Sequence, residues 1–255
     1  MLATRTFTRL ALPSSRSSLL PSSFTAISRF STSSKLAYAH PQAIYKHDKM
    51  TLLDTYSEVI TDHNNVKDLY SRYKRATSDE EKSTLVNTII RELATHSEAE
   101  EVSVYNVLES KGLVSDSKVL RDEHEELEKI LWSVDWTKVS AEEFAPKFDK
   151  AIQLFIQHSD REEEDVLKKL ATQLSPEEND KIARDFLAKR HVVPTRPHPA
   201  APQSGGVMQK VLGMATKPHD KILETLQGRH FADLKYQHEQ GKVEPIKIDS
   251  SIAPL

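Results

Sequence analysis

One phrase occurs twice in this chain and restricts what it can fold into. Residues 96–108 read HSEAEEVSVYNVL, and residues 158–170 read HSDREEEDVLKKL. Both copies place a glutamate four residues after a histidine, in the pairs His96/Glu100 and His158/Glu162. Residues four apart share one face of a helix, so each copy predicts a helix that presents a nitrogen donor beside a carboxylate donor.

Two further histidines extend the repeat. His63 precedes His96 by 33 residues, and His124 precedes His158 by 34 residues. A unit of two histidines and one glutamate is therefore duplicated within residues 51–174. Apolar residues recur in the same register in both copies, at separations close to multiples of 3.6. This periodicity predicts amphipathic helices.

The composition favours an all-α fold. Of the 255 residues 29% are charged, only six are glycine, and no alternating β-branched runs stand out. The chain has no cysteine, which excludes disulfides, thiolate metal sites and thiol nucleophiles. No apolar run approaches the roughly 20 residues that a membrane-spanning helix needs.

The first residues differ in composition from the rest of the chain. Residues 1–47 contain six Lys and Arg residues, many Ser and Thr residues and no acidic residue. This composition is typical of a mitochondrial transit peptide, with a disordered tail as the alternative, so we expect a mitochondrial protein, in the matrix. An internal start at Met50 would give a cytosolic form, a prediction that fails if no product beginning near Met50 is detected.

We predict four long helices, over residues 51–75, 79–110, 115–135 and 141–174. Ser78–Glu81 and Ser140–Glu143 match the Ser-x-x-Glu capping box, and Gly112 gives a stop after the second helix. Short connections make such helices antiparallel neighbours, so the expected domain, residues 48–191, is an up-down-up-down four-helix bundle. The bundle domain should end with a short helix over residues 175–190. Residues 192–255 should contain a Pro-containing linker at 192–206 and a short helix near 218–227.

The turns predict how deep each histidine lies in the bundle. Residues at equal depth in antiparallel neighbours are equidistant from the turn that joins them. The midpoints of successive histidine pairs fall near residues 79, 111 and 141, which are the predicted turns. With a rise of about 1.5 Å per residue, all four histidines should therefore lie at nearly one level.

Four imidazoles and two carboxylates at one level favour a metal centre. Unpaired buried carboxylates cost several kcal/mol each, and no Lys or Arg lies one turn away on the same face. The six donors His63, His96, Glu100, His124, His158 and Glu162 are too many for one tetrahedral zinc and suit two ions, each held by two histidines with the glutamates bridging. Nitrogen and oxygen ligands favour two iron ions, with manganese or zinc as substitutes. Glu101 and Glu163, rotated about 100° from their neighbours, are predicted to be solvated.

At these residues the chain resembles the hemerythrin-like, or HHE cation-binding, domain of fungal type. The resemblance covers about residues 51–175 and implies a four-helix bundle around a non-haem di-iron centre, with the six residues as ligands. Oxygen-carrying hemerythrins use a fifth histidine and an aspartate, and no extra core-facing histidine is visible in the bundle here. The ligand set is instead similar to members linked to nitric oxide, peroxide or iron stress.

The resulting hypothesis is a di-iron protein that reacts with or senses a small oxidant such as O₂, NO or peroxide. The alternative is an iron- or oxygen-responsive interaction module without turnover, whose C-terminal region contacts an unidentified protein. A nucleic-acid partner is not expected, and the sequence shows no catalytic residues beyond the ligands. Five further histidines lack a partner at ligand spacing and are predicted to lie at the surface: His191, His198, His219, His230 and His238.

Overall fold

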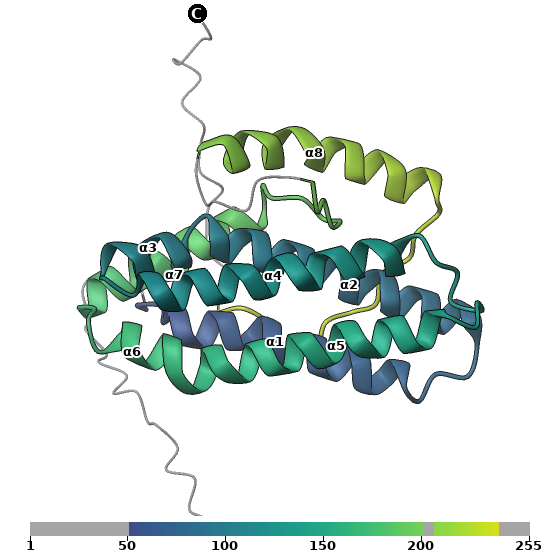
Figure 1. The fold of residues 1–255 in the computed structure, drawn as a ribbon, viewed down its shortest axis with the longest axis horizontal. Coiled ribbons are helices and arrows are strands. Elements are labelled where there is room, and N and C mark those ends of the chain that lie inside the picture. The colour runs from purple at the N-terminus through teal and green to yellow at the C-terminus, as the bar shows by residue number, and fades with distance from the viewer. Residues whose placement is uncertain (1–50, 201–206, 240–255) are drawn as a thin grey trace, which may run out of the picture. The chain divides into compact units, whose positions relative to one another are not determined.

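The computed structural model describes residues 51–200 and 207–239, and of residues 207–214 it describes the backbone alone. Every regular element in these residues is a helix, which confirms the all-α prediction. Four long helices lie side by side in Figure 1: α1 (Thr55–Tyr73), α2 (Asp79–Glu101), α4 (Val114–Asp135) and α5 (Phe144–Arg161). Each packs against two of the others, α1 against α2 and α5, and α4 against α2 and α5. None of the helices in the described residues is long and apolar enough to span a membrane.

Further helices complete the described part of the chain. The helix α3 (Val104–Ser110) connects α2 to α4, and α5 continues through a π-helical turn (Glu162–Val166) into α6 (Leu167–Ala171). The helix α7 (Pro176–Arg190) packs against α1, α2 and α3. The last helix is α8 (Val207–Leu226). It passes through Pro218, so the expected short helix at 218–227 is the end of a longer one; a proline is disfavoured inside a helix but does not always end it.

The helix ends follow the sequence signals in most places. The Ser78 hydroxyl accepts a hydrogen bond from the Glu81 amide at 3.2 Å, and Ser175 forms a complete capping box with Glu178. Gly112 has a φ of +83°, and the Leu113 amide donates to the Leu108 carbonyl at 2.9 Å. This is the expected glycine stop, because only glycine adopts that backbone conformation without strain.

The predicted capping box at Ser140 is wrong. The helix α5 begins at Phe144, and its N-cap residue, Glu143, makes no side-chain capping bond. Pro146 explains the late start. In a helix that began at residue 141, the proline ring would clash with the carbonyl of Glu142, whereas Pro146 is tolerated in the first turn of a helix that begins at Phe144.

The predicted single helix over 79–110 is interrupted beside the glutamate of the first repeat. The helix α2 ends at Glu101, and Ser103 leaves the helical conformation with φ −130° and ψ −80°. The Ser103 hydroxyl donates to the Ala99 carbonyl at 2.6 Å. The second repeat is also irregular at its glutamate, because the π-helical turn begins at Glu162. Irregular helical turns of this kind are frequent at functional sites.

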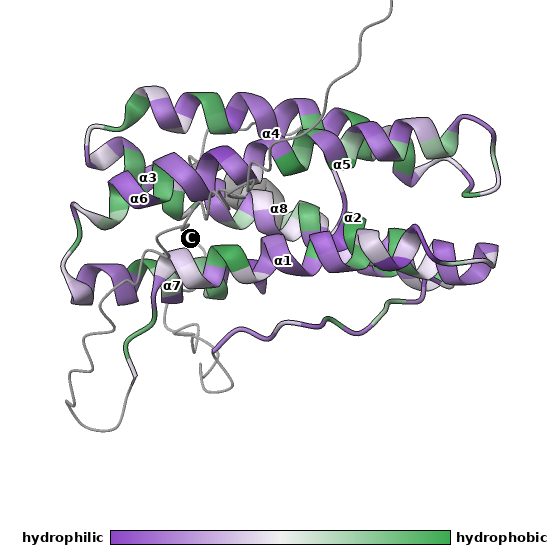
Figure 2. Cartoon of the chain, turned by 90° about the horizontal axis from the view of Figure 1, so that it is seen from below, coloured by the Kyte–Doolittle hydropathy of each residue, from purple (hydrophilic) through white to green (hydrophobic). Residues whose placement is uncertain are grey.

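The apolar core is divided into two clusters, and the histidines lie between them. On α1, His63 lies between Val59 of one cluster and Val66 of the other. On α4, His124 lies in the same way between Leu120 and Leu127. Figure 2 shows hydrophilic and hydrophobic residues alternating along these helices. The fold therefore holds a polar layer inside the bundle, closed above and below by packed apolar side chains.

Candidate metal centre

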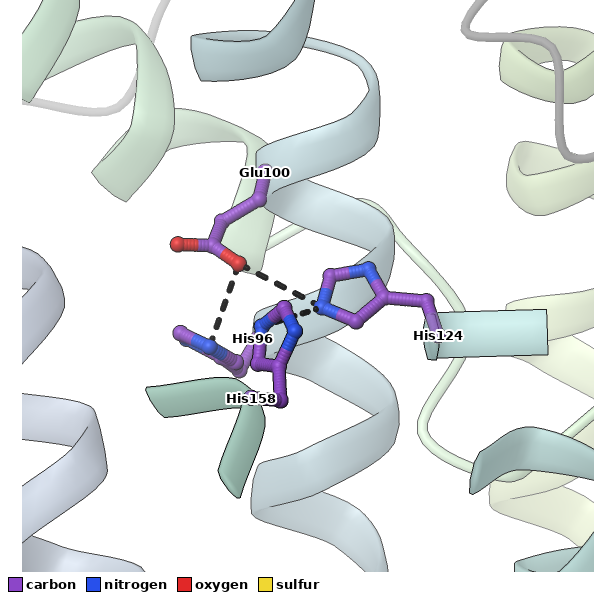
Figure 3. Close-up of side chains that lie close together, drawn as sticks. All are labelled: His96, Glu100, His124 and His158. Atoms are coloured by element: carbon purple, nitrogen blue, oxygen red, sulfur yellow. Dashed lines mark hydrogen bonds and ion pairs between the residues drawn. The ribbon is translucent and has the colours of Figure 1, made fainter. Parts of the chain in front are cut away.

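The structure brings the four histidines of the repeat together. Their side chains are almost fully buried, and their Nε2 atoms face inward in two pairs. The Nε2 atoms of His63 and His96 are 3.1 Å apart, and those of His124 and His158 are 3.0 Å apart. Figure 3 shows His96 and His124 in contact with the Glu100 carboxylate, and His158 in contact with His124. The four histidines therefore lie at nearly one level of the helices, as their distances from the turns predicted.

Both glutamates of the repeat point into the same space. The Oε2 atom of Glu100 lies 3.1 Å from His96 Nε2 and 3.6 Å from His124 Nε2. The Oε2 atom of Glu162 lies 3.4 Å from His63 Nε2 and 3.8 Å from His158 Nε2. Each carboxylate therefore lies between one histidine of each Nε2 pair. Two overlapping sets of donors are close enough to hold an ion: His96, Glu100, His124 and His158, and His63, His96, Glu100 and Glu162.

Each histidine is oriented by a carboxylate on its outer side. The Nδ1 atoms contact carboxylate oxygens at 2.8–3.2 Å, in the pairs His63/Glu163, His96/Asp62, His124/Glu101 and His158/Glu123. A proton on Nδ1 satisfies each of these contacts and leaves the Nε2 lone pair free to bind a cation. Carboxylates that orient histidines in this way are typical of metal sites.

The prediction that Glu101 and Glu163 are solvated is therefore wrong. Glu101 is fully buried, and the side chain of Glu163 is 18% exposed. On a helix, the residue next to a metal ligand points away from the metal. In this bundle, that direction faces a neighbouring helix, where the side chain contacts a histidine. Asp62 and Glu123 were missed for another reason: an acidic residue before a histidine carries no signal by itself. The signal lies in the repeat, because both copies place an acid directly before the first histidine.

A third layer of cationic side chains surrounds these outer carboxylates. Lys67 contacts Glu163 at 3.1 Å, Arg121 contacts Glu101 at 3.7 Å, and Arg161 contacts Glu123 at 2.5 Å. Arg190, from α7, pairs with Asp62. Each of the four outer carboxylates thus has its own cation, which lowers the cost of burying its charge.

Glu100 and Glu162 have no such partner. In the part of the chain that the structure describes, no Lys or Arg forms an ion pair with either side chain, and both are fully buried. Glu100 Oε1 and both oxygens of Glu162 lack any hydrogen-bond partner. Burial, and next the charge of Glu162, raise the pKa of Glu100 well above its usual range. Two carboxylates facing four imidazole lone pairs form a buried cluster of donors whose chemistry fits positive ions.

Two of the four histidines favour the neutral form, which is the form that binds metal. Burial lowers the pKa of His96 to about 3 and holds that of His124 well below its usual range, so both rings are neutral. Tyr105 lies beside them and is fully buried; its hydroxyl donates to Glu100 Oε2 at 3.1 Å and lies 3.2 Å from His124 Nε2. Tyr105 was not predicted as part of the site, because its position in an apolar stretch is typical of ordinary core packing. Phenylalanine rings limit the space for water, since Phe155 packs edge-on against His63 and Phe186 against His96.

Two of the C-terminal histidines expected at the surface are partly buried. His238 contacts Glu58 at 2.8 Å and Asp62 at 3.0 Å, and His198 contacts Asp220 at 2.9 Å. Residues 193–196 are also packed rather than a free linker; Arg196 is 3% exposed and pairs with Asp135. These contacts were not predictable from spacing, because the segments that make them have no helical periodicity. The predicted presequence, residues 1–47, lies outside the described residues.

A family of domains and two known proteins match parts of this chain. Residues 54–170 match the family described as the Hemerythrin HHE cation binding domain. The chain is 29% identical over 183 residues to an uncharacterized hemerythrin-like protein of Schizosaccharomyces pombe, covering 70% of this chain and 88% of that protein. It is 25% identical over 135 residues to a DNA nickase of Nostoc sp., covering 53% of this chain and 38% of the nickase. No solved structure matches the chain significantly. Residues 54–170 thus match a hemerythrin HHE cation-binding domain, and the His/Glu cluster within these residues can bind metal.

Proposed function

We propose that this chain is a hemerythrin-like protein that holds two iron ions in the bundle and reacts with or senses a small oxidant such as O₂, NO or peroxide. The observation that carries the proposal is the pairing of charges around the pocket. Every outer carboxylate is paired with a Lys or Arg, whereas Glu100 and Glu162 at the centre face histidines and have no Lys or Arg partner within the described residues. Metal ions would supply the missing positive charge.

The donors divide into two positions. His63 and His96 would hold one ion, His124 and His158 would hold the other, and Glu100 and Glu162 would bridge them. Support comes from the two Nε2 pairs, at 3.1 Å and 3.0 Å, and from the position of each glutamate between one histidine of either pair. A nitrogen and oxygen donor set suits iron, and manganese or zinc could replace it. Long helices that follow one another along the chain also pack against each other, in the pairs α1/α2, α2/α4 and α4/α5. This packing supports an up-down-up-down arrangement of the four long helices.

The protein's own residues would prepare the site for a small ligand. A ferrous pair, when bound, supplies electrons and an open coordination position for the oxidant. Tyr105 holds a proton on its hydroxyl at 3.1 Å from Glu100, where it can donate a hydrogen bond into the site. Phe155 and Phe186 keep the surroundings apolar and exclude water. A small ligand suits this pocket better than a nucleic acid, and the match to a DNA nickase covers only 38% of that protein.

Metal titration of the purified protein tests the proposal. Wild-type protein titrated anaerobically with Fe(II) should bind two equivalents, and its optical spectrum should change when O₂, NO or peroxide is added. The His96→Ala variant should bind less iron and lose that response, while a His230→Ala variant should behave as the wild type does, because His230 is exposed. Wild-type protein that folds without metal and binds none would refute the proposal. Iron binding without a response to any oxidant would leave the metal site and refute the proposed reactivity.

We also propose that residues 1–47 direct the chain to the mitochondrial matrix. The support is the acid-free, Arg- and Ser-rich composition of that segment. Fusion of residues 1–47 to a fluorescent protein should give mitochondrial fluorescence, and a fusion beginning at Met50 should not. Diffuse fluorescence of the first fusion would contradict this assignment.

A further inference from the structure

One of the four outer carboxylates is held differently from the others. The carboxylates Glu163, Glu101 and Glu123 are paired with cations from the long helices themselves, namely Lys67 of α1, Arg121 of α4 and Arg161 of α5. Asp62 is paired with groups from outside those helices. They are Arg190, at the end of α7, and His238, in the segment after α8.

This segment, residues 229–239, is here called the C-terminal strap. It follows α8 and runs in extended form alongside α1 (Figure 2). The side chain of Asn65, fully buried on α1, accepts a hydrogen bond from the Tyr236 amide at 2.8 Å and donates one to the Tyr236 carbonyl at 3.0 Å. Thr88 of α2 accepts from the Ala232 amide at 2.8 Å. The backbone of the strap is therefore fixed at two positions by specific side chains.

The strap places His238 on the outer side of the proposed metal site. Its Nδ1 lies 2.8 Å from Glu58 Oε2, and its Nε2 forms an ion pair with Asp62 Oδ1 at 3.0 Å. The second oxygen of Asp62, Oδ2, lies 3.2 Å from His96 Nδ1. Asp62 thus connects His238 directly to a histidine whose other nitrogen faces the pocket. Burial lowers the pKa of His238, but the contacts with Asp62 and Glu58 outweigh it and raise that pKa to about 9, so the ring carries a charge.

We propose that His238 is a positioning residue for the metal position formed by His63 and His96, and that this position requires the docked strap while the His124/His158 position does not. The inference rests on the proposed two-metal site. Asp62 orients the His96 ring, and its own position depends on being held from both sides. Without His238, the buried Oδ1 of Asp62 would lose its ion-pair partner, and Arg190 alone would set the direction of the carboxylate. Carboxylates that orient a ligand affect metal affinity by about 10–100-fold.

The consequence is a difference between the two halves of a repeated site. The carboxylates that contact His124 and His158 are paired with Arg121 of α4 and Arg161 of α5, so we expect their orientation to survive displacement of the strap. Displacement of the strap, by a partner or by proteolysis, would weaken one metal position and spare the other. The bundle would then hold one metal ion in place of two.

Cobalt(II) titration of the full chain tests this inference, with the visible absorption of the bound ion as the readout. Wild type should take up two equivalents with similar affinity. In His238→Ala the first equivalent should bind as in wild type, and the second should weaken about 10–100-fold. His238→Gln, whose amide can donate to one of the two carboxylates, should recover most of that loss. His230→Ala is the matched control, because it removes an exposed histidine from the same strap.

A second readout separates this inference from the proposed function. In metal-free protein, the ¹⁵N shifts of His96 should report a proton on Nδ1 in wild type and a mixture of tautomers in His238→Ala. Wild-type protein that binds no cobalt would overturn the two-metal proposal and, with it, the metal dependence inferred here; the tautomer measurement would still decide whether His238 positions His96. Two unchanged equivalents in His238→Ala, or equal weakening of both, would overturn the inference while leaving the metal centre intact.

Discussion

Replacement of Glu100 by glutamine should change the free energy of unfolding in opposite directions with and without metal. Glu100 is fully buried, its Oε1 has no hydrogen-bond partner, and it forms no ion pair with a Lys or Arg of the described residues. A buried polar atom without a partner costs about 1–3 kcal/mol. The amide of glutamine is uncharged and can donate to the neighbouring Glu162, whereas buried Glu100 must first take up a proton to do either. At neutral pH, metal-free Glu100→Gln should therefore be more stable than wild type by about 1–2 kcal/mol.

Metal should reverse this order. At a metal concentration of about 1,000 times the Kd, binding adds about 4.1 kcal/mol to the wild type. If loss of the carboxylate weakens binding by about 100-fold, the variant gains only about 1.4 kcal/mol under the same conditions. After subtraction of its advantage without metal, the variant should be less stable than wild type by about 1 kcal/mol.

Urea denaturation followed by circular dichroism measures both differences, once with a chelator and once with excess Co(II). Glu125→Gln is the control, because Glu125 lies on the outer side of α4 in a pair with Lys129. It should change stability by less than about 0.5 kcal/mol in either condition. A Glu100→Gln protein that is destabilised equally with and without metal would refute the reasoning, since Glu100 would then contribute to packing and not to a cation site.

Three more substitutions test the surroundings of the pocket. Glu101→Gln should keep the helical content and lower the metal affinity about 10–100-fold in a competition titration, because His124 loses the carboxylate that orients it. Tyr105→Phe should lower the free energy of unfolding of metal-free protein by about 1 kcal/mol in urea, because its buried hydroxyl no longer donates to Glu100. Burial raises the pKa of Glu128 from 4.5 to about 7. The folded protein therefore holds this proton more tightly than the unfolded chain, and the stabilising contribution is complete below pH 4.5 and lost as the pH rises to about 7. Relative to Glu128→Gln, the wild type should lose up to about 3 kcal/mol of stability over that window.

Each of these expectations has a contrary result. Unchanged affinity of Glu101→Gln would show that Glu101 does not orient His124. A loss well above about 3 kcal/mol in Tyr105→Phe would indicate that the hydroxyl supports the packing of the whole pocket. A difference between wild type and Glu128→Gln that stays constant from about pH 4.5 to about pH 7 would show that Glu128 remains charged in the folded protein.

The sequence predicted the parts of the structure that depend on local geometry. Helix periodicity and the spacing of the histidines from the turns placed His63, His96, His124 and His158 at one level, because rise per residue is nearly constant in helices. The Gly112 stop was predicted for a similar reason, since positive φ at a helix end selects glycine. These inferences need only the helix and its immediate neighbours.

The parts that were missed depend on neighbouring helices. Glu101 looks solvated on an isolated helix, and it is buried because His124 of α4 lies opposite. The interruption after α2 and the π-helical turn at Glu162 leave no mark in an apolar pattern. His238 could not be assigned at all, because the strap that carries it has no periodicity and its partner Asp62 lies 176 residues earlier in the chain.

Mössbauer spectroscopy of protein reconstituted with ⁵⁷Fe tests the central claim most directly. It counts the irons and shows whether they are magnetically coupled. The account predicts two irons per chain, and in the oxidised protein a spin-coupled pair that is absent from Glu100→Gln. A single uncoupled iron, or two irons that remain uncoupled after oxidation, would contradict the claim that His63, His96, Glu100, His124, His158 and Glu162 form one two-metal site.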